Sequence, residues 1–162
     1  MTAVAESDQR AMREALAEAR AALATADVPV GAVVLDAGGR VIGRGRNERE
    51  KLHDPTAHAE VVALREAALA MGDWQLTGCS LVVTLEPCVL CAGAILAARI
   101  TRVVFGSWDE KAGAAGSVVD LLRERRLPYR VAEVVGGVDE VECAALLRDF
   151  FEQQRRSSPT RG

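Results

Sequence analysis

The sequence has 162 residues, a formal net charge of −3 and 49% hydrophobic residues. This length accommodates one domain with a substantial core, and the apolar share favours a packed globule over a disordered chain. The small net charge excludes the overall basicity that is typical of many nucleic-acid-binding proteins, although two basic segments occur at 123–130 and 155–162.

The N-terminal residues carry charges throughout, and no segment reaches the apolar length of a signal peptide or a membrane-spanning helix. We therefore expect a cytoplasmic protein without a membrane partner, in which thiols stay reduced. We also expect a single domain over residues 1–156 and a disordered tail over 157–162, because the sequence SSPTRG has a composition typical of disorder.

Apolar periodicity near the N-terminus predicts an amphipathic helix from Asp8 to about Thr25. Residues 28–35 and 40–47 are expected to form a β-hairpin, because the turn sequence DAGG lies between them. A polar loop follows at 48–56. The next helical pattern covers 58–70 and ends before Gly72, a residue that commonly stops helices.

The second half of the chain alternates strand and helix patterns around a Gly-rich loop at 108–117. Strands are predicted at 79–86, 102–107 and 129–135, and helices at 88–100, 118–125 and 139–156. Strands that alternate with helices after an initial hairpin indicate an α/β fold. We expect a three-layer α/β/α architecture with a central mixed five-stranded sheet.

Two of the four cysteines, Cys88 and Cys91, stand three residues apart directly behind Pro87. Proline suits the first turn of a helix, so this motif marks a helix start. The helix dipole and free backbone N–H groups there favour thiolate over thiol, and the i, i+3 spacing places both sulfurs on one face. The pair is therefore predicted to bind a soft metal ion, and zinc fits best.

A third ligand is expected at another helix start, and His58 is the candidate because it follows the turn at Asp54-Pro55. Three protein ligands leave a fourth position for water, which is the arrangement of catalytic zinc. Glu60 would reach that water from the first helical turn without binding the metal. His-x-Glu followed by Pro-Cys-x-x-Cys is the signature of zinc-dependent nucleobase deaminases, in which the glutamate is the general acid and base.

This signature predicts hydrolytic deamination of a nucleobase. The water would give a proton to Glu60 and attack a ring carbon that bears an amino group, either C4 of cytosine or C6 of adenine. Glu60 would then protonate the adjacent ring nitrogen and assist the departure of ammonia. The competing hypothesis is a non-enzymatic zinc module whose metal has a fourth protein ligand, for which His53, Cys79 and Cys143 are the available residues.

Several segments resemble the bacterial tRNA-specific adenosine deaminases, a family with the cytidine-deaminase-like fold. The similarity runs from about Asp8 to Arg156 and includes VPVGAVV, DPTAHAE, TLEPCVLCAGAI, DEKAGAAGS and ECAALLRDFF, of which the last two are more particular to the tRNA enzymes. The resemblance implies conversion of the wobble adenosine of an arginine tRNA to inosine. It also implies a tRNA anticodon stem-loop as partner, one Zn²⁺ per chain and a homodimer.

The resemblance implies roles for residues outside the zinc motif as well. Asn47 would hydrogen-bond the flipped base, although asparagine is also common as a turn residue at strand ends. Val30 and Leu85 would line the base pocket.

Contacts to the RNA beyond the edited base are implied for Asp109, Lys111 and Phe151. Of the adjacent Phe150 and Phe151, one is expected in the core and the other on the surface as a stacking platform for an unpaired nucleotide. The sequence departs from the family at Trp108, where a basic residue is common, and at Leu90, where methionine is frequent. The first of these departures concerns RNA contacts and not the zinc chemistry.

A deaminase of free guanine or cytosine is the alternative enzyme, with the same zinc site in a closed pocket. Asp109, Lys111, Phe151 and the basic C-terminal end favour an RNA substrate instead. A free base requires no electrostatic contact beyond its pocket, whereas an RNA loop brings phosphates with it.

Overall fold

The structure, a computed structural model, describes residues 5–158. Helix α1 (Glu6–Ala21) continues into a 3₁₀ turn, η1 (Ala22–Thr25), which leads to β1 (Gly31–Leu35) and β2 (Val41–Arg46). The middle of the chain contains α2 (Arg49–Leu52), α3 (Ala59–Met71), β3 (Ser80–Leu85), α4 (Val89–Ala97) and β4 (Arg102–Ser107). The last two elements are β5 (Glu133–Val135) and α5 (Glu140–Ser157).

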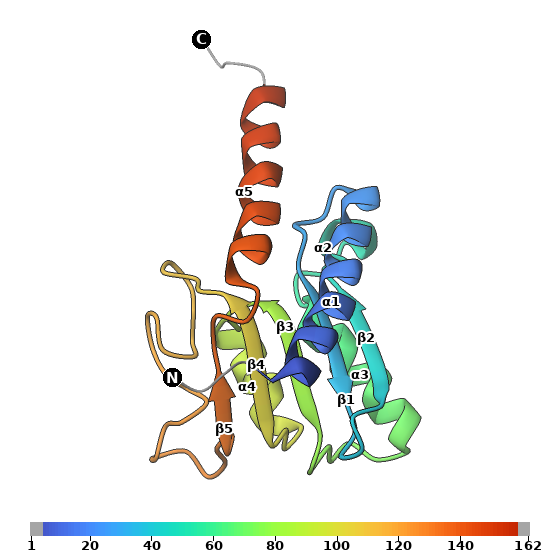
Figure 1. The fold of residues 1–162 in the computed structure, drawn as a ribbon, viewed down its shortest axis with the longest axis vertical. Coiled ribbons are helices and arrows are strands. Elements are labelled where there is room, and N and C mark those ends of the chain that lie inside the picture. Colours follow the sequence, from blue (N-terminus) through green and yellow to red (C-terminus); the bar gives the residue numbers. More distant parts are fainter. Residues whose placement is uncertain (1–4, 159–162) are drawn as a thin grey trace.

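The strands form one five-stranded sheet in the order β2-β1-β3-β4-β5. β1 pairs antiparallel with both β2 and β3, whereas β3, β4 and β5 run parallel. Helices α1 and α5 lie on one face of the sheet, and α3 and α4 lie on the other (Figure 1). The predicted three-layer α/β/α architecture with a mixed sheet is therefore confirmed.

The sheet separates two apolar cores because successive side chains of a strand point to opposite faces. In β1, Ala32 and Val34 pack with α3 and α4, whereas Val33 packs with α1. Both faces of the central strands are covered, so these strands are apolar nearly throughout, as expected for a sheet between two helical layers.

The prediction of a helix at 118–125 is wrong. This segment is irregular, with turns and an isolated β-bridge between Ala115 and Asp120. Its backbone hydrogen bonds join it to other segments: Leu121 N–H donates to Ala114 O, and Val131 N–H donates to Leu122 O. Leu122 is fully buried in the core on the α3 and α4 side. Its burial explains the apolar pattern that suggested a helix, because tertiary packing overrides local propensity.

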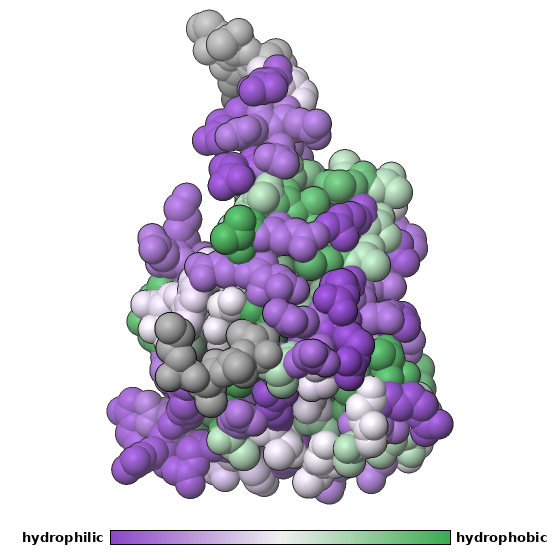
Figure 2. Space-filling view, in the orientation of Figure 1, coloured by the Kyte–Doolittle hydropathy of each residue, from purple (hydrophilic) through white to green (hydrophobic). Residues whose placement is uncertain are grey.

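Three further differences concern the element bounds. The polar loop at 48–56 contains the short helix α2, and β5 is shorter than the predicted strand at 129–135. Helix α5 extends to Ser157, into the predicted tail, of which residues 159–162 lie outside the described residues. This helix projects beyond the sheet, and its projecting part carries hydrophilic residues (Figures 1 and 2). Each helix within residues 5–158 is too short or too polar to cross a membrane.

Candidate active site

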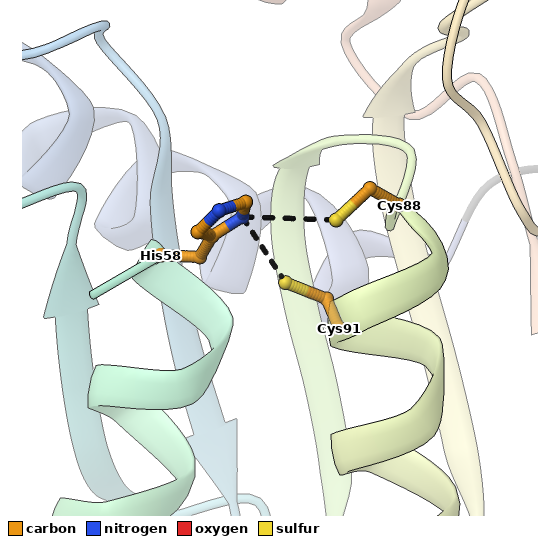
Figure 3. Close-up of side chains that lie close together, drawn as sticks. All are labelled: His58, Cys88 and Cys91. Carbon is orange, nitrogen blue, oxygen red and sulfur yellow. Dashed lines mark hydrogen bonds between the residues drawn. The ribbon is translucent and has the colours of Figure 1, made fainter. Parts of the chain in front are cut away.

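The metal-ligand candidates lie where two helices begin. His58 is the N-cap of α3, and Cys88 is the N-cap of α4. Pro87 therefore precedes the N-cap, whereas the sequence suggested a place in the first helical turn. Because α3 and α4 pack on the same face of the sheet, their N-terminal ends meet, and the three side chains point toward one another (Figure 3).

The side chains of His58, Cys88 and Cys91 form a compact set of possible metal ligands. His58 Nδ1 lies 3.7 Å from Cys88 Sγ and 3.5 Å from Cys91 Sγ. Ordinary Zn–N and Zn–S bond lengths around a tetrahedral ion separate the nitrogen and sulfur atoms by about 3.6 Å. These donors therefore fit Zn²⁺ in both spacing and chemical type.

No fourth His, Cys, Asp or Glu donor joins this set within residues 5–158. Cys79 and Cys143 are buried in the two apolar cores on opposite faces of the sheet. His53 is exposed at the C-terminal end of α2, in a left-handed backbone conformation. None of the three residues that could have made a closed structural site contributes to the set, so the described residues supply three donors, the number that catalytic zinc sites use.

Hydrogen bonds within the ligand set favour one thiolate and one thiol in the absence of metal. The hydrogen bond from Cys91, together with His58, lowers the pKa of Cys88 to about 3. The same hydrogen bond to Cys88 raises the pKa of Cys91, and Cys88 likewise raises the pKa of His58. The thiolate form of Cys88, the form in which cysteine binds a metal ion, is therefore favoured.

Glu60 lies in the first turn of α3 and is only 4% exposed. Burial raises its pKa, an effect that a hydrogen bond with Cys91 partly offsets. The carboxylate thus lies beside the metal ligands without belonging to their set and does not point into bulk solvent. A buried carboxyl group with a raised pKa is typical of general acid–base catalysts.

A pocket of about 250 Å³ opens above His58, Glu60 and Cys88. Five of the six substrate-binding residues implied by the resemblance line it: Val30, Asn47, Leu85, Asp109 and Phe151. The sixth, Lys111, does not line this pocket but an adjoining groove. The structure therefore brings together residues that lie far apart in the sequence, in a space of the size that a nucleobase requires.

Asn47 is buried and held in a defined orientation at this pocket. Its backbone N–H donates to Val30 O at 3.1 Å, and its side-chain Oδ1 accepts the Arg49 N–H at 3.2 Å. Within residues 5–158 the side-chain Nδ2 has no protein acceptor, which leaves this donor for a ligand in the pocket.

Comparison with known proteins agrees with this geometry. Residues 5–107 match the zinc-binding region of cytidine and deoxycytidylate deaminases. The tRNA-specific adenosine deaminase of Bacillus subtilis is 44% identical over 92% of this chain and 91% of its own length. The chain belongs to the tRNA-specific adenosine deaminase family.

The fold of the chain is also similar to solved deaminase structures. A solved structure from a study of A-to-I editing by tRNA:A34 deaminases is 43% identical, with a TM-score of 0.81 over 85% of this chain and 99% of that one. The tRNA(Ile)-lysidine synthase of Deinococcus deserti is 51% identical over 90% of this chain, but the matched region is 27% of that relative. The deaminase chain thus spans about a quarter of the length of that longer relative.

Sequence reasoning missed two segments that build the walls of the deaminase pocket. Arg49 lines the pocket from α2, and buried Asp27 holds α2 by accepting the Glu50 N–H at 2.7 Å and the Lys51 N–H at 3.3 Å. No sequence signal marks this pairing, because α2 lies within a polar loop and Asp27 follows a distant helix.

Glu86 was also missed, although its position gave a signal. A carboxylate at the end of an apolar strand, directly before the Pro-Cys motif, requires buried donors. Its carboxylate receives them from the loop at 109–117, where the N–H groups of Asp109, Ala115 and Ser117 donate to it. Glu86 thereby fixes the loop that carries Asp109 and Lys111 beside the deaminase pocket.

Proposed function

We propose that this enzyme converts adenosine to inosine at the wobble position of a tRNA anticodon loop, with an arginine tRNA as the expected substrate. The observation that carries the proposal is the convergence of the zinc ligands, Glu60 and Asn47 in one pocket that adjoins a larger groove. The 44%-identical relative from Bacillus subtilis, a tRNA-specific adenosine deaminase, supports the choice of tRNA over a free base.

The chemistry divides between the metal and the chain. Bound by His58, Cys88 and Cys91, zinc supplies the Lewis acidity that makes water a nucleophile near neutral pH. Glu60 accepts the proton of the attacking water on its carboxylate and passes it to the adenine ring nitrogen beside C6. The same carboxylate then assists the departure of the amino group as ammonia, and the ring retains oxygen at C6.

Other residues of the pocket orient the base rather than take part in proton transfer. We assign to the Asn47 Nδ2 a hydrogen bond to the ring, because this donor has no protein acceptor in the described residues. Val30 and Leu85 supply the apolar walls against which the ring packs. A pocket of this kind requires that the base be flipped out of its stack, which is easiest in a single-stranded loop.

The RNA around the edited base would be held at the rim of the pocket. Phe151 is 46% exposed and lines both the pocket and the groove, whereas Phe150 is buried. Asp109 is fixed by Glu86 and in turn accepts the N–H groups of Lys111 and Ala112 at 3.1 Å. These contacts support ordered rather than mobile positions for the residues that would meet the anticodon.

The decisive experiment incubates the zinc-loaded enzyme with total tRNA and sequences the product for adenosine-to-inosine changes. We expect one edited wobble position. The variant Glu60→Ala should retain its zinc and lose roughly 10²–10⁴-fold in turnover, because proton transfer by a placed carboxylate contributes about this much. Zinc content and turnover are measured on the same preparation.

Free adenosine, cytidine and guanine are assayed in parallel with the tRNA. Conversion of guanine or cytidine with untouched tRNA would favour the free-nucleobase deaminase instead. Near-normal tRNA editing by Glu60→Ala would refute the assigned role of Glu60.

We further infer that the enzyme is a homodimer that acts in the cytoplasm, where its tRNA substrate is found, and that residues 1–156 form one deaminase domain. Val89 and Leu90 support the dimer, because these apolar side chains are exposed beside the metal ligands on α4, a helix without charged residues. Light scattering of the purified enzyme measures the mass of the assembly directly.

A further inference from the structure

The groove beside the base pocket has a volume of about 910 Å³ and is much larger than one base requires. One wall is the face of α5 on which residues recur at helical spacing, including Leu147, Arg148, Phe151 and Arg155. The other wall is the segment from Ser107 to Ala112. Because Val28, Leu85, Asp109, Ala112 and Phe151 line both spaces, the groove is continuous with the base pocket.

Trp108 lies in this groove as a half-exposed but fixed aromatic side chain. It is 43% exposed, and its ring meets the fully buried Phe105 edge to face, with centroids 4.8 Å apart and an interplanar angle of 89°. The backbone of Gly136 packs directly against the Trp108 ring, since a Cβ at that position would lie only 2.7 Å from it. The ring therefore keeps one orientation while part of its surface remains open to the groove.

The charges that line the groove suit a polyanion. Lys111, Arg148 and Arg155 are exposed, and none of them has an ion-pair partner in the described part of the chain. Of the acidic residues in the lining, Asp109 is occupied with backbone N–H groups, and Glu110 is exposed. Unpaired cations beside a flat aromatic surface are the combination that binds single-stranded nucleic acid.

We propose that this groove is a second nucleotide site, in which Trp108 stacks on an unpaired base next to the edited adenosine. The inference rests on the proposed function and adds a specific contact to it. Lys111, Arg148 and Arg155 contact the phosphates on either side of that base. Since every base has a flat face, stacking on Trp108 raises affinity for the loop with little preference for the identity of the neighbouring nucleotide.

Tryptophan fluorescence tests this contact directly, because the chain has two tryptophans. The second, Trp74, is 58% exposed and lines surface grooves with residues of α3, away from the base pocket. In a Glu60→Ala background, which slows turnover, Trp74→Phe leaves Trp108 as the reporter and Trp108→Phe leaves Trp74. Both variants are titrated with an anticodon stem-loop RNA, and binding is followed independently by the anisotropy of a labelled stem-loop.

We expect saturable quenching of Trp108 with the same midpoint as the anisotropy change, and no quenching of Trp74. An unchanged Trp108 signal at RNA concentrations that saturate binding would overturn the inference. This result would leave the proposed function intact, because binding is measured separately in the same titration.

Kinetics give a second test with the otherwise unmodified enzyme. Trp108→Ala should raise KM for the stem-loop roughly 5- to 150-fold, the range that corresponds to the loss of one stacked base. Trp108→Phe should restore most of this affinity, because it keeps a flat ring, and Trp74→Ala should leave KM unchanged. Equal KM values for wild type and a folded, zinc-loaded Trp108→Ala would contradict the site, whereas failure of the wild type to edit tRNA would contradict the proposed function instead.

Discussion

Glu86 shows at the scale of one residue how a buried charge organises the site. It is 1% exposed and accepts hydrogen bonds from the backbone of Asp109, Ala115 and Ser117 at 3.0–3.1 Å, and from the Ser117 hydroxyl group. Burial alone would raise its pKa, but the donors from this loop outweigh burial and hold the pKa below its ordinary value. The carboxylate therefore stays ionised and keeps the loop in place.

This pKa shift predicts how stability responds to acid. The pKa of Glu86 is 4.5 in the unfolded chain and lower in the folded one, so its contribution is complete above 4.5 and is lost as the pH falls through the folded-state value. Glu86→Gln should destabilise the protein by about 2 kcal/mol at pH 7, because it replaces a charged acceptor of several hydrogen bonds. The difference from wild type should shrink below pH 4.5.

Urea denaturation at several pH values between 7 and 3 measures this effect. Glu110→Gln is the matched control, since Glu110 lies in the same loop but is exposed. The control should follow the wild-type curve. A difference between wild type and Glu86→Gln that stays constant down to pH 3 would show that Glu86 is not the titrating group.

At the scale of elements, the close approach of α3 to β2 positions the first half of the active site. A Cβ at Gly45 would lie 2.2 Å from Ala59 O, and one at Gly43 would lie 2.4 Å from Ala63 O. Only glycine allows the helix backbone to lie directly on the strand at these two positions. This contact fixes the position of the N-terminal end of α3, where His58 is the N-cap and Glu60 lies in the first turn.

Gly45→Ala should therefore affect both stability and metal binding. We expect a loss of about 1–3 kcal/mol in the free energy of unfolding, the usual cost of overpacking, and a lower zinc occupancy, because the N-terminal end of α3 must shift. Gly38→Ala in the turn of the same hairpin is the control, since its Cβ would lie 3.4 Å from the nearest atom, Asp36 Oδ1. Denaturation curves and zinc content are measured for both variants. Full zinc occupancy in Gly45→Ala would refute the idea that the contact between α3 and β2 positions the metal ligands.

At the scale of the whole molecule, the distribution of charge matters more than its sum. The net charge is −3, yet the groove carries Lys111, Arg148 and Arg155 without ion-pair partners in the described residues. Arg123 and Arg126, in the basic segment at 123–130, pair with Asp120 and Glu124. Phosphate binding is therefore expected at the groove and not at the segment 123–130.

Salt dependence tests this distribution. With three phosphate contacts at roughly −0.7 each, a plot of log affinity for the stem-loop against log salt concentration should have a slope of about −2. Arg155→Ala should make that slope less steep by about 0.7. Arg65→Ala, on α3 at the opposite face of the sheet, should leave it unchanged. A slope near zero for the wild type would show that these three side chains do not contact phosphates.

The local chemistry of this protein can be predicted from neighbouring residues in the sequence. Both zinc motifs are helix starts, and helix starts are encoded by neighbouring residues: the Asp54-Pro55 turn before His58 and Pro87 before Cys88. The alternation of strands and helices can also be predicted from the spacing of apolar residues alone, since that spacing shows which face of a strand or helix is buried. For the same reason the pattern misled at 118–125, where Leu122 is buried without being helical.

That these local motifs share one site follows from the packing of the folded chain and not from the motifs themselves. The N-terminal ends of α3 and α4 meet because both helices pack on the same face of the sheet, and β1 and β3 are neighbours in it. Asn47, Phe151 and Lys111 reach the pocket or its groove from the residue after β2, from α5 and from a loop, over separations that no local pattern records. Distances between segments depend on how the layers pack, and packing is a property of the whole chain.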